Sequence, residues 1–170
     1  MDGVAGLLAH PIPPTYDENS EILILGSFPS VKSRETGYFY GHPQNRFWKV
    51  VAALYDEQTP ATVPERRDFL LRNHIAVWDV IASCEIRGSS DTSIKNVTAN
   101  DLSFILGKAR IRAIYLNGRT AEKLYRKYIA GDIEIPAVCL PSTSPANAAW
   151  SLDRLTEAWR VITQYRSEKR

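Results

Sequence analysis

Short apolar runs alternate along the chain with segments whose apolar residues recur every three or four positions. The runs that have the length of buried strands lie at 22–25, 75–81, 111–116 and 135–140. Segments of helical periodicity lie at 45–54, 64–73, 102–109, 119–128 and 151–165. Because strands that alternate with helices favour a mostly parallel sheet covered on both faces, the pattern predicts an α/β fold around a four-stranded sheet.

Polar segments interrupt this alternation at three places. Residues 1–20 are rich in proline and lack periodicity, so we expect an extended N-terminal arm along the surface. Residues 26–45 are expected to form a long loop after the first strand, and residues 82–99, rich in Ser and Thr, a second one. Since there are no internal repeats and no convincing boundary, we expect a single domain over 1–170.

The ends of the predicted strands are expected to meet. If the strands run parallel, the segments that follow them open at one edge of the sheet, where α/β proteins bind ligands. These segments are 26–45, 83–96, Asn117 and 141–147. The first carries rings at Phe28, Tyr38, Phe39, Tyr40 and His42, an unusual content for a disordered loop. We therefore expect one cleft lined by these segments.

The composition is that of an ordinary globular protein. Of the 170 residues, 44% are hydrophobic and 24% are charged, and the apolar runs are far shorter than the roughly 20 residues that a membrane span needs. The N-terminus lacks the basic region of a signal peptide. Cys84 and Cys139 lie far apart and do not indicate a disulfide framework. We expect a protein of the cytoplasm or nucleus that is neither secreted nor bound to a membrane.

The net charge does not by itself indicate a nucleic-acid-binding protein. The formal net charge is +2, but Lys and Arg gather at 108–112, 119–127 and 166–170. On charge alone, solvated helix faces are the simpler interpretation of these clusters, and a surface for nucleic acid stays open.

Several common kinds of site are missing from the sequence. Gly26-Ser-Phe-Pro-Ser30 has neither the ending of a Walker loop nor the glycines of a dinucleotide-binding loop. No Cys or His pair has the spacing of a metal site, so we expect no metal and no cofactor. The hydroxyl residues 142–144 have no nucleophile elbow around them, but between two prolines they suit the binding of phosphates. Asp79 and Glu85 give only weak support to a glycosidase with paired carboxylates.

Asn45 and His42 precede a predicted helix and allow two interpretations each. Asn45 is a natural helix cap, but its amide also has the chemistry to orient a water in the cleft. His42 is a possible acid, although a histidine before proline is more often structural. His10, in the arm, and His74, near a helix end, are expected to be structural.

The segment Thr36-Gly-Tyr-Phe-Tyr-Gly-His-Pro-Gln-Asn-Arg-Phe-Trp-Lys49 closely resembles the loop and helix of mismatch-specific uracil-DNA glycosylases. Gly26-Ser-Phe-Pro-Ser30 falls on the first motif of that superfamily, and Leu140-Pro-Ser-Thr-Ser-Pro-Ala-Asn147 on its second, DNA-gripping motif. The three segments together most closely resemble the DNA-deoxyinosine (hypoxanthine-DNA) glycosylase branch. The resemblance implies a uracil-DNA glycosylase-like fold, a three-layer αβα sandwich around a four-stranded, mainly parallel sheet.

The resemblance also implies roles for individual residues. Where the mismatch-specific enzymes hold the attacking water with an Asn, this chain has Phe28, so amides elsewhere are expected to do that work. Asn45 is the expected catalytic residue, and His42 a possible accessory one. The expected base pocket is Gly26, Ser27, Phe28, Tyr40, which would stack on the base, and Asn117. The expected DNA contacts are Ser142, Thr143, Ser144, Pro145 and Ala146.

These residues lead to a hypothesis for the function. The chain is expected to be a monofunctional DNA glycosylase that flips out and hydrolytically excises deaminated bases, hypoxanthine preferred, and leaves an abasic site. Its expected partner is double-stranded DNA that contains a deaminated base, and a monomer is expected. The alternatives are a uracil or mismatch-specific DNA glycosylase and a non-catalytic module that binds damaged DNA.

Overall fold

The computed structural model describes residues 6–169, and within them a parallel sheet forms the centre of the molecule. Its strands are β2 (Ile22–Gly26), β3 (Ile75–Asp79), β6 (Ala113–Asn117) and β7 (Ala137–Leu140), in the order β3-β2-β6-β7. All three neighbouring pairs run parallel, and Gly26 at the end of β2 is paired with Asp79 at the end of β3. The predicted four-stranded sheet is therefore confirmed.

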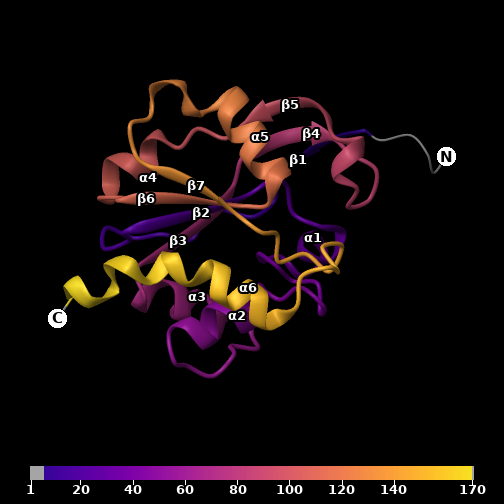
Figure 1. Cartoon of the computed structure of the whole chain (residues 1–170). Helices are drawn as coiled ribbons and strands as arrows, with labels where there is room; N and C mark the ends of the chain where they lie inside the picture. Colours follow the sequence, from indigo (N-terminus) through magenta and orange to yellow (C-terminus); the bar gives the residue numbers. More distant parts are fainter. Residues whose placement is uncertain (1–5, 170) are drawn as a thin grey trace.

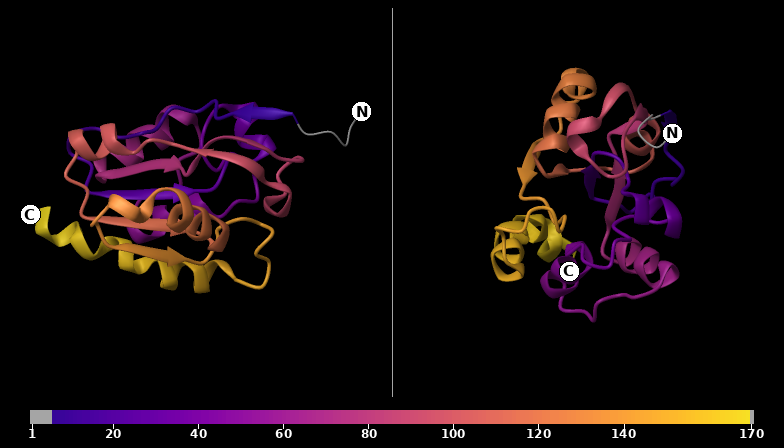
Figure 2. Two further views of the ribbon diagram at one scale, coloured as in Figure 1. Left: turned by 90° about the horizontal axis from the view of Figure 1, so that it is seen from above. Right: turned by 90° about the vertical axis from the view of Figure 1, so that its right-hand side faces the viewer.

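Helices cover both faces of this sheet (Figure 1). On one face lie α2 (Phe47–Leu54), α3 (Val63–Arg72) and α6 (Leu152–Trp159), and on the other lie α4 (Ser103–Lys108) and α5 (Arg119–Tyr128). The two outer layers are separated by the sheet when the molecule is turned (Figure 2). The three-layer αβα architecture is confirmed. The helix predicted at 151–165 is shorter than expected, since a 3-10 segment, η3 (Arg160–Lys169), follows α6.

The segment 82–99, expected to be a loop, instead contains two strands. β4 (Ile81–Glu85) and β5 (Lys95–Ala99) pair antiparallel, and β1 (Leu7–Ala9) joins them in the order β1-β4-β5. The strand predicted over 75–81 therefore ends at Asp79, and the chain turns at Val80 into this second sheet. The β4–β5 pairing has register shifts and β5 is largely exposed, so neither strand has the apolar alternation that marks a buried strand.

The loop predicted over 26–45 contains a short helix, α1 (Val31–Thr36). Ser30 caps it, because its side chain accepts a hydrogen bond from the backbone N–H of Ser33. Gly37 ends it in the left-handed conformation, with a φ of 80°. The helix was hidden in the sequence because it has a single buried residue and no apolar stripe.

The N-terminal arm is held to the molecule more firmly than the sequence suggested. Its residues 1–5 lie outside the described part of the chain, but Thr15 forms a β-bridge with Val77 of β3. Ile12 is buried, and its carbonyl accepts a hydrogen bond from the indole of Trp78. The described part of the chain has no helix with the length and apolar character needed to cross a membrane.

Candidate active site

A cavity of about 350 Å³ opens at the edge of the central sheet where the parallel strands end. Each strand contributes: Gly26 and the residues after it follow β2, Asp79 ends β3, Asn117 ends β6, and Ser142 to Ser144 follow β7. The volume lies in the range of small-molecule pockets. The cleft expected from the strand ends is therefore present, and Ser89, Ser90 and Asp91, between β4 and β5, complete its wall.

Asn45 lines this cavity and also shapes the start of α2. Its side-chain Oδ1 accepts a hydrogen bond of 2.9 Å from the backbone N–H of Phe47, and its own N–H donates to the carbonyl of His42. The cap expected at Asn45 is displaced by one residue, because Arg46 is the N-cap of α2 and Asn45 lies just before it. The contact with Phe47 does not prevent the second role, the binding of a water. A carbonyl oxygen has two lone pairs, so Oδ1 can hold Phe47 and still accept a second hydrogen bond from a water in the cavity.

Arg46 fastens the loop after β7 to the first turn of α2. Its guanidinium donates to the carbonyls of Ser144 at 2.9 Å, Asn147 at 3.1 Å and Trp150, and its backbone N–H donates to the carbonyl of Thr143. Arg46 belongs to the motif over residues 36–49, but nothing in the sequence predicted a role for it. The contacts span about a hundred residues of sequence, so no local pattern could have identified them.

The loop after β7 is a turn with several hydrogen bonds of its own. Ser142 Oγ accepts from the N–H of Ser144, and Ser144 Oγ accepts from the N–H of Ala146. The amide of Asn147 donates to the carbonyl of Ser142 at 2.9 Å. Ala146 is exposed at the tip and Pro145 is half-buried. Of the expected DNA contacts, Ser142, Thr143, Ser144 and Ala146 line the cavity, and Pro145 does not.

Thr143 and Asn117 hold the turn against the sheet. Asn117 Nδ2 donates to Thr143 Oγ1 at 3.0 Å, and the N–H of Thr143 donates to Asn117 Oδ1 at 3.0 Å. Thr143 is fully buried, so in this structure its side chain supports the loop. Gly118 follows with a φ of 99°, and a Cβ on it would lie 3.1 Å from Ser142 Cβ, so glycine allows the turn to pack closely here.

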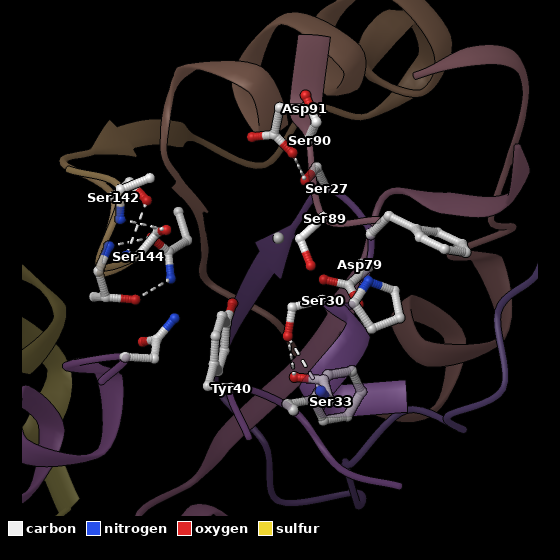
Figure 3. Close-up of a pocket in the computed structure, with 18 residues that line it drawn as sticks. Ser27, Ser30, Ser33, Tyr40, Asp79, Ser89, Ser90, Asp91, Ser142 and Ser144 are labelled. Atoms are coloured by element: carbon white, nitrogen blue, oxygen red, sulfur yellow. Dashed lines mark hydrogen bonds between the residues drawn. The ribbon is translucent and has the colours of Figure 1, made fainter. Parts of the chain in front are cut away.

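Tyr40 stands in the middle of the site. Its ring stacks on that of Phe47 with centroids 4.2 Å apart, and its backbone is left-handed, with a φ of 53°. Figure 3 shows the ring between the turn of Ser142 and Ser144 on one side of the cavity and Asp79 on the other. Among the described residues the buried hydroxyl has no hydrogen-bond partner. Burial, and to a lesser extent the Asp79 carboxylate, raise the pKa of this phenol well above its ordinary value.

Gly26 leaves space for the polar groups at the floor of the cavity. A Cβ on Gly26 would lie 2.5 Å from Asp79 Oδ1 and 3.2 Å from the Tyr40 hydroxyl. Ser27 and Phe28 follow it along the wall, and Ser27 Oγ donates to Asp91 at 3.4 Å. Phe28 also packs into a small apolar cluster with Ile81, Cys84 and Ile86.

Asp79 and His10 form a buried pair that was not predicted from the sequence. His10 Nε2 lies 2.7 Å from Asp79 Oδ2, and the two side chains are 4% and 5% exposed. His10 was expected to be an ordinary residue of the arm. Because the partners are 69 positions apart and on different elements, spacing alone could not have joined them. Glu85, the other carboxylate expected near the cleft, instead accepts a hydrogen bond from Asn96 in the small sheet.

His42 lies before α2 and is not among the residues that line the cavity. Its Nδ1 accepts a hydrogen bond of 3.0 Å from the N–H of Gln44, so its ring shapes the loop that leads to Asn45. Within residues 6–169 there is no group of three or more His, Cys, Asp or Glu side chains that could hold a metal ion.

Comparison with known proteins agrees with this architecture. The family model of the uracil DNA glycosylase superfamily matches residues 13–163. A hypoxanthine DNA glycosylase of Methanosarcina acetivorans is 35% identical over 155 residues, which cover 90% of this chain and 96% of that protein. A hypoxanthine DNA glycosylase of Methanosarcina barkeri is 37% identical over 109 residues, 63% of this chain and 69% of that protein.

The similarity extends to a solved structure. The solution NMR structure of a candidate uracil DNA glycosylase from Methanosarcina acetivorans superposes with a TM-score of 0.80 at 32% sequence identity. The match covers 94% of this chain and 98% of that one.

Proposed function

Since the chain belongs to the uracil DNA glycosylase superfamily, we propose that it is a monofunctional DNA glycosylase that excises hypoxanthine in preference to other deaminated bases. The observation that carries this proposal is the cavity itself. It places the Asn45 amide and the Tyr40 ring in one slot, with the turn of Ser142 and Ser144 at its rim. The substrate is double-stranded DNA, and the protein acts as a monomer.

The target nucleotide leaves the base stack and enters the cavity. Extrusion costs a few kcal/mol and is least costly for a mispaired base such as hypoxanthine. One face of the Tyr40 ring is covered by Phe47, and the extruded base stacks on the other face. Ser142 and Ser144 contact the DNA backbone beside the extruded nucleotide, and Pro145 and Ala146 enter the gap that it leaves.

The glycosidic bond then breaks by hydrolysis. As the C1′–N9 bond lengthens, positive charge develops on the sugar, as in other glycoside cleavages. Asn45 Oδ1 holds the water that adds its hydroxyl to C1′, and the remaining proton goes to the departing base. Catalysis depends on the positioning of the water and on a preorganised site. The products are free hypoxanthine and an abasic site.

Two observations favour a purine over uracil. The relatives from both Methanosarcina species are named hypoxanthine DNA glycosylases. In addition, Phe28 stands in the motif that follows β2, where the mismatch-specific uracil enzymes use an Asn to hold water. We therefore assign the water to Asn45, which also lines the cavity.

An excision assay tests the proposal. Duplex oligonucleotides that carry one deoxyinosine or one deoxyuridine are incubated with the protein and then cleaved with alkali at abasic sites. We expect strand scission mainly with deoxyinosine, and Asn45→Ala should greatly reduce it. Lys49 is an exposed residue of α2, so Lys49→Ala is the matched control and should excise as the wild type does. Binding without scission would contradict the proposed activity, and stronger scission with deoxyuridine would contradict the preferred base.

A further inference from the structure

The floor of the cavity holds two polar atoms without partners. No hydrogen bond from a described residue reaches Asp79 Oδ1, and none reaches the buried hydroxyl of Tyr40. Both atoms lie close to Gly26, where a Cβ would collide with Asp79 Oδ1 and would make a tight contact with the Tyr40 hydroxyl. Buried polar groups are nearly always hydrogen-bonded, so these two atoms are available to bond a water or a group of a ligand in the cavity.

The backbone fixes the position of Asp79. Asp79 is paired with Gly26 where β3 and β2 run side by side. Its backbone carbonyl accepts a hydrogen bond of 2.9 Å from the side-chain amide of the buried Asn100. In Figure 3 the carboxylate lies on the side of the cavity away from the turn of Ser142 and Ser144. Asp79 is therefore a fixed group at the inner wall, where the edge of an inserted base would arrive.

His10 fixes the direction of the carboxylate. The N–H of Ile12 donates to His10 Nδ1 at 3.2 Å, so Nδ1 carries a lone pair and the proton lies on Nε2. Nε2–H then donates to Asp79 Oδ2 at 2.7 Å. The imidazole is enclosed edge to face by Phe28 and Trp78, with ring centroids 5.8 Å and 6.2 Å away. One carboxylate oxygen is thus occupied, and Oδ1 is left as a pure acceptor that faces the cavity.

We propose that Asp79 reads the ring N–H that deamination creates on a base, and that His10 is the positioning residue that aims it. This inference rests on the proposed function. In adenine N1 carries a lone pair, and in hypoxanthine it carries a proton. A pure acceptor opposite N1 therefore forms a hydrogen bond with hypoxanthine and meets a lone pair in adenine, so the unaltered base is rejected.

Binding to uncleavable DNA tests this assignment directly. Two duplexes carry a 2′-fluoroarabino nucleotide whose base is either hypoxanthine or unsubstituted purine, which has a lone pair at N1. A third duplex carries a tetrahydrofuran abasic site and has no base to read. We expect the wild type to bind hypoxanthine about 10–100-fold more tightly than purine, the range for a buried hydrogen bond to a charged group.

The variants separate reading of the base from general stability. Asp79→Ala should lose most of the preference for hypoxanthine over purine while its affinity for the abasic duplex stays unchanged. His10→Ala should lose part of the preference, and His10→Gln, which keeps an N–H donor, should restore it. Glu134→Ala removes an exposed carboxylate outside the cavity and is the matched control. Thermal unfolding of each variant shows whether it is folded.

Three results would overturn the inference. The first is a wild type that binds the hypoxanthine and purine duplexes equally tightly. The second is an Asp79→Ala variant that keeps the preference for hypoxanthine. The third is an Asp79→Ala variant whose affinity falls equally for all three duplexes. A failure of the proposed function looks different, because the preference would persist while deoxyinosine in ordinary DNA is not excised.

Discussion

Asn117 and Thr143 are joined by two hydrogen bonds, so the end of β6 and the turn after β7 form one unit. Both groups of the Asn117 amide are used, one as donor and one as acceptor. The wall of the cavity and the loop expected to contact DNA therefore move together. Asn117 was expected in the base pocket, and it does line the cavity, but the hydrogen bonds of its amide go to the loop.

Asn117→Ala should therefore lower both the stability of the protein and its affinity for DNA. The change leaves the buried Thr143 hydroxyl and N–H without partners, so the free energy of unfolding should fall by about 1–3 kcal/mol. Chemical denaturation and titration with an abasic duplex measure the two effects. Normal stability together with normal DNA affinity would show that the pair does not hold the loop.

Asn45→Ala should lower the single-turnover excision rate of deoxyinosine by about a hundredfold to a thousandfold, the usual cost of removing one preorganised group from an active site. DNA affinity should stay nearly intact, because Asn45 is not among the expected phosphate contacts, which lie in the turn of Ser142 and Ser144. Loss of the hydrogen bond from Phe47 should cost only about 1 kcal/mol of stability. A fully active variant would contradict the catalytic role of Asn45.

Arg46→Ala should destabilise the protein and weaken DNA binding. Three carbonyls of the loop lose their donor, and each hydrogen bond from a charged group contributes about 1.5–3 kcal/mol. Arg46→Lys should rescue only part of the loss, because an ammonium lacks the planar fork that reaches several acceptors. Unfolding curves of both variants, beside that of Lys49→Ala, provide the measurement. Full rescue by Lys would show that the charge alone matters.

Tyr40→Phe should keep excision activity, whereas Tyr40→Ala should lose it, if the ring serves to stack on the base. The hydroxyl has no partner in the described structure, so its removal should leave the free energy of unfolding unchanged or raise it by about 1 kcal/mol. Single-turnover rates of the two variants test this expectation. Equal losses in both would mean that the hydroxyl, and not the ring face, acts on the substrate.

The raised pKa of the Tyr40 hydroxyl leads to a prediction for how the free energy of unfolding changes with pH in the alkaline range. The folded pKa of Tyr40 is raised by burial, so the folded protein keeps a proton that the unfolded chain releases above about pH 10. The contribution is complete below the unfolded pKa and is lost as the pH rises toward the folded one. Tyr40→Phe should therefore lose less stability than the wild type between about pH 9 and pH 11. If the wild type and Tyr40→Phe lose the same amount of stability over this pH range, Tyr40 is not the group responsible.

The sequence predicted those elements whose residues are buried in a regular pattern. All five residues of β2 are buried, which gave a continuous apolar run, and α5 was predicted at its observed bounds. β4 and β5 escaped prediction because half-exposed strands with irregular pairing show no clear alternation. The short helix α1 escaped because it depends on the Ser30 cap and on Gly37.

The candidate site was predictable as far as the strand ends allowed. Gly26, Asn45 and Asn117 all line the cavity because parallel strands bring their carboxyl ends together. Two parts of the site were not predictable. The contact of His10 with Asp79, and the hold of Arg46 on the loop near Trp150, join segments far apart in sequence. Only the folded structure brings these partners within hydrogen-bonding distance.

The docking of the N-terminal arm has a practical consequence for how the protein is produced. The stretch shared with the superfamily begins at residue 13, three positions beyond His10. A recombinant version trimmed to that stretch would keep the central sheet and Asn45, yet it would lack both β1 and the imidazole that contacts Asp79. Expression with the natural leading residues, and a cleavable tag at the opposite end, keeps the floor of the cavity whole.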